Sequence, residues 1–402
     1  MKTHGSIKNV PGQAVTGKNF FGRIKEAEEG WNLIKKESKS LMLADSRRVG
    51  KSSFAYKMID KAKKEKWNHV FCDMRGYGNE EILYEKFITE LEKNRQYKNI
   101  RAKENKWKLD EIEVSPEALT FRAGTLKLKR QNKNTSQNAN IYSNLEQILD
   151  HTKDTLIVFD ELIIFLNHLK GEKNESLKDA ILFMEWLEGM RKKPDSKIRW
   201  ILCSSLSIDD FTSTHKLDGK MEGLYRFTID ELKGNEPAEF IRALAKSYKL
   251  KFSKEAVQYM LDKLGWYLPY FIQLLFQEIR KCNTVNISPE TIEDAYKNLL
   301  AESKKQKYFK TWIEHLNTYP EDEKKYAYTI LETLSKRKEG SSINVLKPLI
   351  LGIVKEDEKA DKILNHLLEK LEKGGYIMRT NRKYLFRSPL LRDFWYNTFI
   401  KK

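Results

Sequence analysis

A short basic segment that contains one glycine carries the residue types that bind phosphate. Residues 47–53 read Arg-Arg-Val-Gly-Lys-Ser-Ser. Here Gly50 would let the backbone approach a phosphate, and amides at the start of a following helix would donate hydrogen bonds to it. Lys51 would bridge the β- and γ-phosphates, and the Ser52 hydroxyl would bind Mg²⁺. We therefore predict a P-loop for a nucleoside triphosphate; the alternative is a basic turn that only caps a helix.

One residue departs from the usual spacing of this motif. The pattern GxxxxGK[ST] places its first glycine at Asp45. Aspartate tolerates the left-handed backbone conformation better than most residues, so the turn can survive. A carboxylate near a triphosphate would weaken binding unless it points away or pairs with Arg47 or Arg48. We therefore expect the loop to fold, and its affinity for nucleotide to depend on where this carboxylate points.

A second set of candidate residues follows other apolar runs. The run 155–159 (Thr-Leu-Ile-Val-Phe) ends in Asp160 and Glu161. Asp160 would hold Mg²⁺ through water, and Glu161 would be the general base that polarises the attacking water. The alternative is an acidic pair at the solvent edge of a strand. Ser205, after the run 199–203, would sense the γ-phosphate or orient the water.

A parallel sheet is the element that would position these residues. Five short apolar runs are predicted to be strands: 41–44, 69–74, 155–159, 199–203 and 224–228. Helical periodicity marks 25–36, 52–64, 80–93, 143–151 and 177–191. Such alternation predicts an α/β fold, a P-loop core with a parallel five-stranded sheet covered by helices. Residues 97–138 interrupt the pattern as an insertion at the sheet margin, with a predicted hairpin at 119–129.

The second half of the chain is predicted to be mainly helical. Helical segments span 236–248, 254–264, 269–282 and 289–302, the last begun by Ser288 as N-cap and Pro289. From about residue 308, three or four helices precede two short strands around 380–382, which is the layout of a winged helix. The predicted domains are an arm (1–18), a P-loop domain (19–233), an all-helical lid (234–305) and a winged-helix domain (306–402).

Composition restricts the class of protein. The chain has 402 residues, 40% of them hydrophobic and 33% charged, and a formal charge of +17. No apolar run is long enough to span a membrane and the amino-terminal residues are not those of a secretory signal, so we expect a cytoplasmic protein without membrane contact. Cys72, Cys203 and Cys282 form no metal or disulfide pattern. The basic charge permits binding to DNA, for which Arg379, Arg382 and Lys383 on the predicted wing are candidates.

In this order the motifs resemble the STAND-type P-loop ATPases of the archaeal-ATPase-like group, relatives of the origin-recognition branch of AAA+ proteins. The resemblance extends from Asn19 to about Asn397. Four segments carry it: 20–23 with Glu26, similar to an hhGRxxE motif; 46–53, similar to the RRxGK[TS] P-loop; 265–273, a lid motif with Gly and Pro; and 384–395, which closes a winged helix.

The resemblance implies an ATP-dependent switch with a closed ADP state and an open or assembled ATP state, in which nucleotide held between core and lid fixes the winged helix. It implies that Phe21, Gly22, Arg23, Arg47, Arg48, Val49, Gly50, Lys51, Ser52, Ser53 and Pro269 contact ATP or ADP. The implied catalytic residues are Lys51, Asp160, Glu161 and Ser205, with Ser52 and Asp160 at Mg²⁺. Arg191 and Arg226 are candidates for a trans-acting arginine, or are structural.

Three functions fit these residues. The first is an ATP-hydrolysing switch that assembles with a protein partner or with itself, and that turns over slowly until the partner supplies an arginine. The second is a nucleotide-gated DNA-binding or scaffold protein in which Asp45 has degraded catalysis. The third is a signalling or defence component whose effector activity resides in a partner.

Overall fold

The computed structural model describes residues 6–98, 135–150, 153–171, 177–205, 207–306 and 308–401. The predicted insertion at 97–138 and its hairpin at 119–129 lie almost wholly outside these residues. The described chain forms two compact units. The P-loop unit contains the described residues up to Ala27, Ala44–Lys57 and Thr228–Lys402. The sheet unit contains Glu28–Leu43 and Met58–Phe227.

The five predicted strands form one sheet, in the order β2-β3-β4-β1-β5. Their bounds are Ser40–Ala44 (β1), Asn68–Asp73 (β2), Thr155–Asp160 (β3), Ile198–Ser204 (β4) and Leu224–Arg226 (β5). The pairs β2/β3, β3/β4 and β1/β5 are parallel, with Asp73 opposite Asp160. All of β3 is buried, as the continuous apolar run predicts for a strand covered on both faces. Only β5 is shorter than predicted.

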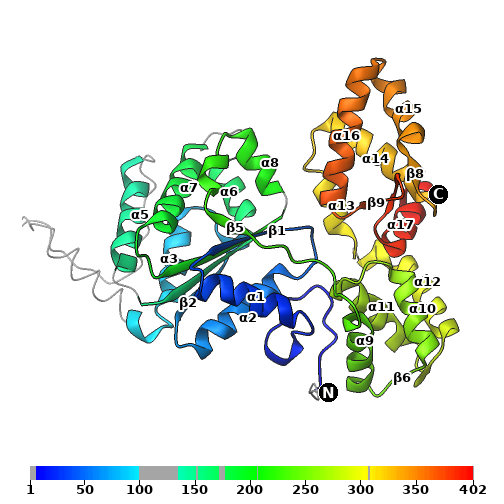
Figure 1. Cartoon of the computed structure of the whole chain (residues 1–402), viewed down its shortest axis with the longest axis horizontal. Helices are drawn as coiled ribbons and strands as arrows, with labels where there is room; N and C mark the ends of the chain where they lie inside the picture. Colours follow the sequence, from blue (N-terminus) through cyan, green and yellow to red (C-terminus); the bar gives the residue numbers. More distant parts are fainter. Residues whose placement is uncertain are drawn as a thin grey trace, which may run out of the picture. The chain divides into compact units, whose positions relative to one another are not determined.

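Helices cover both faces of this sheet. In Figure 1, α1 and α2 lie on one side of it and α5, α6 and α7 on the other. The helices of this region are α1 (Ile24–Lys35), α2 (Lys51–Lys64), α3 (Glu80–Leu91), α5 (Thr135–Asp150), α6 (Leu162–Lys170), α7 (Leu177–Lys192) and α8 (Ser207–Thr214). Of these, α6 and α8 lie outside the predicted elements. Cys72 and Cys203 are buried in strands of the sheet, whereas Cys282 is half-buried.

The helical segment, Glu236–Gln306, packs around one deeply buried helix. It comprises α9 (Glu236–Ser247), α10 (Lys254–Leu264), α11 (Pro269–Lys281) and α12 (Pro289–Gln306). Residues on every side of α11 are buried, so this helix forms the centre of the segment. The prediction that the segment is all-helical is wrong in one detail, since β6 (Lys251–Phe252) and β7 (Asn286–Ile287) form a two-residue parallel pair.

The carboxyl-terminal segment, Lys310–Trp395, combines helices with a small antiparallel sheet of order β8-β10-β9. Its elements are α13 (Lys310–Leu316), α14 (Glu321–Ser335), β8 (Ser341–Ser342), α15 (Ile343–Val354), α16 (Asp357–Lys373), β9 (Ile377–Thr380), β10 (Lys383–Phe386) and α17 (Pro389–Trp395). Asn381 and Arg382 both have positive φ, as a two-residue hairpin turn requires. The two strands predicted around 380–382 are therefore confirmed. Within the described residues, no helix combines the length and apolar character needed to cross a bilayer.

Candidate nucleotide-binding site

The predicted phosphate loop leaves the end of β1 and leads directly into α2. We call residues 45–53 the P-loop segment. Gly50 has φ +102°, and a Cβ there would lie 2.8 Å from an Nη1 atom of Arg23, so both the backbone and the space favour glycine. Helix α2 begins at Lys51. The Lys51 ammonium turns back and donates to the carbonyl oxygens of Asp45 (2.8 Å) and Ser46 (2.9 Å). The loop therefore has a glycine, a lysine and helix-start amides in phosphate-binding order.

Asp45, at the position of the usual first glycine, makes a structural contact. Its Oδ2 accepts a hydrogen bond of 2.9 Å from the backbone amide of Ile229. Ile229 follows β5 and precedes the helical segment, so the carboxylate ties the P-loop segment to the chain that enters that segment. The structure thus gives this side chain a partner other than Arg47 or Arg48, the two that the sequence suggested.

The two arginines of the loop face different neighbours. Arg48 has φ +66° and donates to the carbonyl oxygen of Gly12 at 3.1 Å. Its guanidinium carbon lies 4.8 Å from the ring centre of Tyr270, at the start of α11. The positive charge of Arg47 acts on His315 of the carboxyl-terminal segment and disfavours protonation of its ring. Burial, together with the positive charge of Arg47, lowers the pKa of His315 to about 3.

The hhGRxxE motif is held by the start of the helical segment. Phe21 stacks on Phe240 of α9 with ring centres 5.0 Å apart. The amide of Arg23 donates to Glu236, and its guanidinium donates to the carbonyl oxygen of Asp230. Arg23 is almost wholly buried, and this burial lowers its pKa to about 10, opposed by neighbouring carboxylates. Gly22 has φ +67° beside Glu236, which again favours glycine.

An ordered arm, residues 6–16, runs along the helical segment to the P-loop segment. Backbone amides of the arm donate to side chains of α9, α11 and α2 or their flanks: Ile7 to Ser247, Asn9 to Tyr248, Val10 to Gln273 and Val15 to Ser53. The sequence predicts only an irregular arm here, because these partners are side chains far away in the chain. The Ser53 Oγ therefore binds the arm.

The carboxyl-terminal segment approaches the P-loop segment closely. A Cβ on Gly375 would lie 3.1 Å from the Cβ of Ser46 and 2.6 Å from the ring of Trp266. Trp266 stands three residues before Pro269, the first residue of α11. Arg387 holds the same region through both carboxylate oxygens of Asp230, at 2.7 and 2.9 Å, and its guanidinium lies over the Trp266 ring at 4.4 Å.

Three of the four candidate catalytic residues, Asp160, Glu161 and Ser205, lie in the sheet unit, whereas Lys51 belongs to the P-loop unit. Asp160 ends β3 and is buried, and Glu161 follows with φ +61° just before α6. Asp73, which the sequence analysis did not single out, lies opposite Asp160 in the register of β2 and β3, and Arg75 donates to its carboxylate. That ion pair lowers the pKa of Asp73. Ser205 follows β4, the strand between β1 and β3, and shares a 2.6 Å hydrogen bond with Ser207.

The two candidate trans-acting arginines differ in their contacts. Arg191 donates to the carbonyl oxygens of Glu222 and Lys220, and burial lowers its pKa. Arg226 is half-exposed and pairs with both oxygens of Asp209. The contacts of Arg191 are those of a structural residue, whereas Arg226 lies at the surface.

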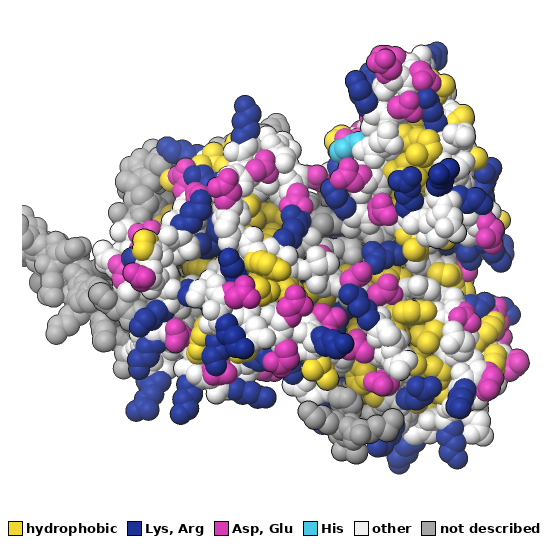
Figure 2. Space-filling model, in the orientation of Figure 1, with side chains coloured by type: hydrophobic (Ala, Val, Ile, Leu, Met, Phe, Trp, Pro, Cys, Tyr) yellow, Lys and Arg dark blue, Asp and Glu magenta, His cyan; other side chains and the backbone are white. Residues whose placement is uncertain are grey.

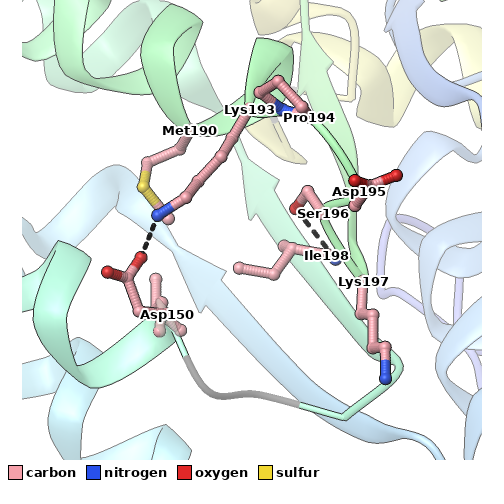
Figure 3. A pocket seen from close by; sticks show the side chains of 9 residues that line it. Asp150, Met190, Lys193, Pro194, Asp195, Ser196, Lys197 and Ile198 are labelled. Carbon is pink, nitrogen blue, oxygen red and sulfur yellow. Dashed lines mark hydrogen bonds and ion pairs between the residues drawn. The ribbon is translucent and has the colours of Figure 1, made fainter.

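A hollow of about 340 Å³ lies elsewhere in the sheet unit. Figure 3 shows that Asp150, Met190, Lys193 and Ile198 line it, with an ion pair between Asp150 and Lys193. Ile198 begins β4, so the hollow lies at the amino end of a strand. The P-loop segment follows the carboxyl end of β1, and parallel strands place these ends at opposite edges of a sheet. We therefore do not assign nucleotide to this hollow.

Among the described residues, no group of three or more His, Cys, Asp or Glu side chains could hold a metal ion. Mg²⁺ is usually bound by one or two protein oxygens together with phosphates and water. The residues in question are Ser52 at the start of α2 and Asp160 at the end of β3.

A parallel α/β sheet with a phosphate-type loop after β1 defines the P-loop class of fold. The chain is similar to the Walker-type ATPase PABY2304 of Pyrococcus abyssi, with 15% identity, a TM-score of 0.62, and coverage of 94% of this chain and 97% of that one. It is also similar to the Aeropyrum pernix ORC2 protein, solved in ADPNP–ADP complexes, with 11% identity, a TM-score of 0.56 and coverage of 95% and 96%. No protein-family model and no curated protein sequence matches the chain. At these identities the likeness shows the fold, and it confirms the α/β P-loop core with a five-stranded sheet.

Proposed function

We propose that this chain is an ATP-binding and ATP-hydrolysing switch of the STAND type. The observation that carries the proposal is the P-loop segment: Gly50 at φ +102°, followed at once by Lys51 as the first residue of α2. This arrangement brings helix-start amides and an ammonium to one place, which suits a polyphosphate. The ATP-type complexes of the structurally similar ORC2 protein support the same ligand class.

In this proposal Ser52 and Asp160 would hold Mg²⁺, which would supply charge neutralisation at the phosphates. The donor set fits, because hydroxyl and carboxylate oxygens are ligands that this hard cation prefers. Glu161 orients and deprotonates the attacking water, and Ser205 contacts the γ-phosphate or the water. Phe21, Gly22 and Arg23 shape the base side of the site, while Arg47, Arg48, Val49, Ser53 and Pro269 contact the nucleotide.

The contacts of the carboxyl-terminal segment support a switch. Gly375 against Ser46, and Arg387 on Asp230, place this segment beside the phosphate loop and the chain that enters the helical segment. A change in the P-loop segment on nucleotide exchange would therefore reach both contacts. We propose that 234–305 is the lid, that 306–402 is a winged helix whose position follows the nucleotide, and that a protein partner or a second copy assembles on the ATP form.

Phosphate release from purified protein tests the hydrolytic part. Mg·ATP should be hydrolysed slowly, and Glu161→Gln should abolish release while ATP binding persists, since only the general base is lost. Glu185→Gln is the matched control, because it replaces an exposed carboxylate on α7 by the same amide, and it should retain turnover. Equal turnover in Glu161→Gln and the control would show that the assignment of the base is wrong.

DNA binding is the second candidate function, and the hairpin β9–β10 favours it. Arg379, Arg382 and Lys383 are all exposed on this hairpin, where they could reach phosphates or a minor groove. On the face shown in Figure 2, basic and acidic side chains are interspersed among the described residues. Fluorescence anisotropy with duplex DNA should show affinity that falls with salt and is lost in Arg379→Ala/Arg382→Ala; equal binding by this variant would exclude the hairpin.

A further inference from the structure

Helix α15 is apolar on all sides but is covered by the protein on only one of them. Its sequence, Ile-Asn-Val-Leu-Lys-Pro-Leu-Ile-Leu-Gly-Ile-Val, has Asn344 and Lys347 as its two polar residues. A helix that is apolar all round normally lies in the interior of a protein. In α15, however, only Leu346 and Ile350 are buried. Most of this apolar helix is therefore partly or fully exposed at the surface of the protomer.

The uncovered apolar residues form one continuous strip along α15. Val345, Pro348, Leu349, Gly352 and Ile353 follow the spacing i, i+3, i+4, i+7, i+8, so they share one face of the helix. Pro348 and Gly352 are exposed, Ile353 is 39% exposed, and the other two are half-buried. Figure 2 shows apolar side chains on the surface where Figure 1 places α15. We call these five residues the α15 strip.

The single charged residue of α15 does not interrupt this strip. The Lys347 ammonium donates to Asp357 and Asp361 of α16, at 2.8 Å in each case, and is thereby turned toward α16. A Cβ on Gly352 would meet no atom within 4 Å, so the strip is open around this residue. The chain as a whole has a formal charge of +17. Because copies of such a chain repel one another least where their surfaces are uncharged, the strip suits contact with a second copy.

The two ends of α15 carry opposite net charge. Residues 336–339, in the turn that leads through β8 into the amino end of the helix, read Lys-Arg-Lys-Glu, three basic residues against one acidic. Residues 355–359, which follow the carboxyl end of the helix, read Lys-Glu-Asp-Glu-Lys, three acidic residues against two basic. All of these residues are exposed. Two copies of α15 packed antiparallel would therefore bring the basic end of each helix to the acidic end of the other.

We propose that the α15 strip is the contact surface of a homodimer, in which a second copy of this chain packs its own α15 antiparallel across a twofold axis. Each copy then uses the same residues, apolar strip against apolar strip and basic turn against acidic run. The inference deepens the assembly proposed above and rests on it for the role of the dimer. Five strip residues and two charged ends are fewer than the about 20–30 residues per side of a standard interface, so the dimer should be weak.

Sedimentation velocity of the full chain without nucleotide, over a range of protein concentrations, tests the contact. The native protein should change from monomer to dimer as its concentration rises. Gly352→Lys should remain a monomer over the same range, because each copy would place an ammonium in the apolar contact. This variant should fold, since the added side chain meets no atom and lysine favours a helix more than glycine does. Gly189→Lys, at an exposed glycine of α7 with equally open surroundings, is the matched control and should dimerise as the native protein does.

Two charge-reversed variants test the antiparallel arrangement. Glu356→Lys/Glu358→Lys has two basic ends, and Lys336→Glu/Lys338→Glu has two acidic ends. Each variant alone should dimerise at least about tenfold more weakly than the native protein, because like charges then face each other at both ends of the contact. An equimolar mixture of the two should dimerise about as strongly as the native protein, because every basic end then meets an acidic one.

The outcomes separate this inference from the proposed function. A native protein that stays monomeric at every concentration, or a Gly352→Lys variant that dimerises like its control, overturns the inference. A mixture of the charge-reversed variants that associates no better than either variant alone overturns the antiparallel arrangement. Calorimetric titration of Mg·ATP into the same native sample tests the proposed function by itself: uptake without a dimer overturns only this inference, and a dimer without uptake overturns only the ATP-binding function.

Discussion

His315 should make the protein less stable at mildly acidic pH. Its Nδ1 atom lies 3.1 Å from the Tyr376 hydroxyl, which donates to the carbonyl oxygen of Trp312 at 2.6 Å. Because that hydroxyl proton is already engaged, the imidazole N–H serves as the donor to Tyr376. The ring is buried, and the nearby cations Arg47, Lys370 and Lys51 disfavour a second proton. Together these effects lower the pKa of His315 to about 3, with burial as the largest cause.

The direction and size of the effect follow from this shift. In the unfolded chain the histidine takes up a proton near pH 6.5, whereas in the folded protein it stays neutral down to about pH 3. The stabilisation that the neutral His315 ring contributes is therefore fully present above pH 6.5, and it is lost as the pH falls through the interval between these two values. At about 1.4 kcal/mol per pH unit, the contribution of His315 to the free energy of unfolding falls by about 2 kcal/mol between pH 7 and pH 5.

Two measurements check this prediction. Urea unfolding at pH 7 and pH 5 should show a pH dependence about 2 kcal/mol smaller for His315→Gln than for the native protein. His366→Gln, a change of an exposed histidine on α16, is the control and should behave as the native protein does. NMR of the imidazole protons should show no titration of His315 between pH 7 and pH 5. Titration of this ring near pH 6.5 would refute the reasoning from burial.

Two further substitutions test the packing around the P-loop segment. Gly50→Ala should lower the free energy of unfolding by about 1–3 kcal/mol, because a backbone φ of +102° strains an alanine and its Cβ would meet Arg23. A calorimetric scan measures this loss, and an unchanged melting temperature would contradict the requirement for glycine. Arg387→Lys should lose about 1 kcal/mol despite keeping its charge, because lysine has no planar group that can stack on the Trp266 ring while it donates to Asp230. Equal unfolding midpoints for Arg387→Lys and the native protein would contradict that view.

The sheet could be predicted from the sequence because its strands are buried on both faces. A strand such as β3, with every residue buried, must be apolar throughout, and the run 155–159 shows this pattern directly. The phosphate loop could be predicted for a related reason, since its glycine and lysine are set by local backbone and chemistry. Secondary structure near such motifs therefore follows from short stretches of sequence.

The partners of several site residues could not be predicted because they are distant in the chain. The Asp45 carboxylate accepts from the Ile229 amide, and nothing in the sequence near either residue indicates that bond. Burial of Asn9 likewise arises only when α9 and α11 pack against the arm. The two-residue pair β6/β7 is too short to give a periodic signal. Long-range contacts of this kind decide whether a polar residue is structural or available to a ligand.

Calorimetric titration of Mg·ATP into native protein and Lys51→Ala tests the central claim most directly. The account predicts saturable uptake by the native protein and a loss of at least about tenfold in affinity for the variant, because one direct charge contact with the phosphates is removed. Lys61→Ala, which removes a lysine from the same helix where it pairs with Glu28, should bind as the native protein does. Absence of uptake by the native protein, or equal affinity of Lys51→Ala, would contradict the account.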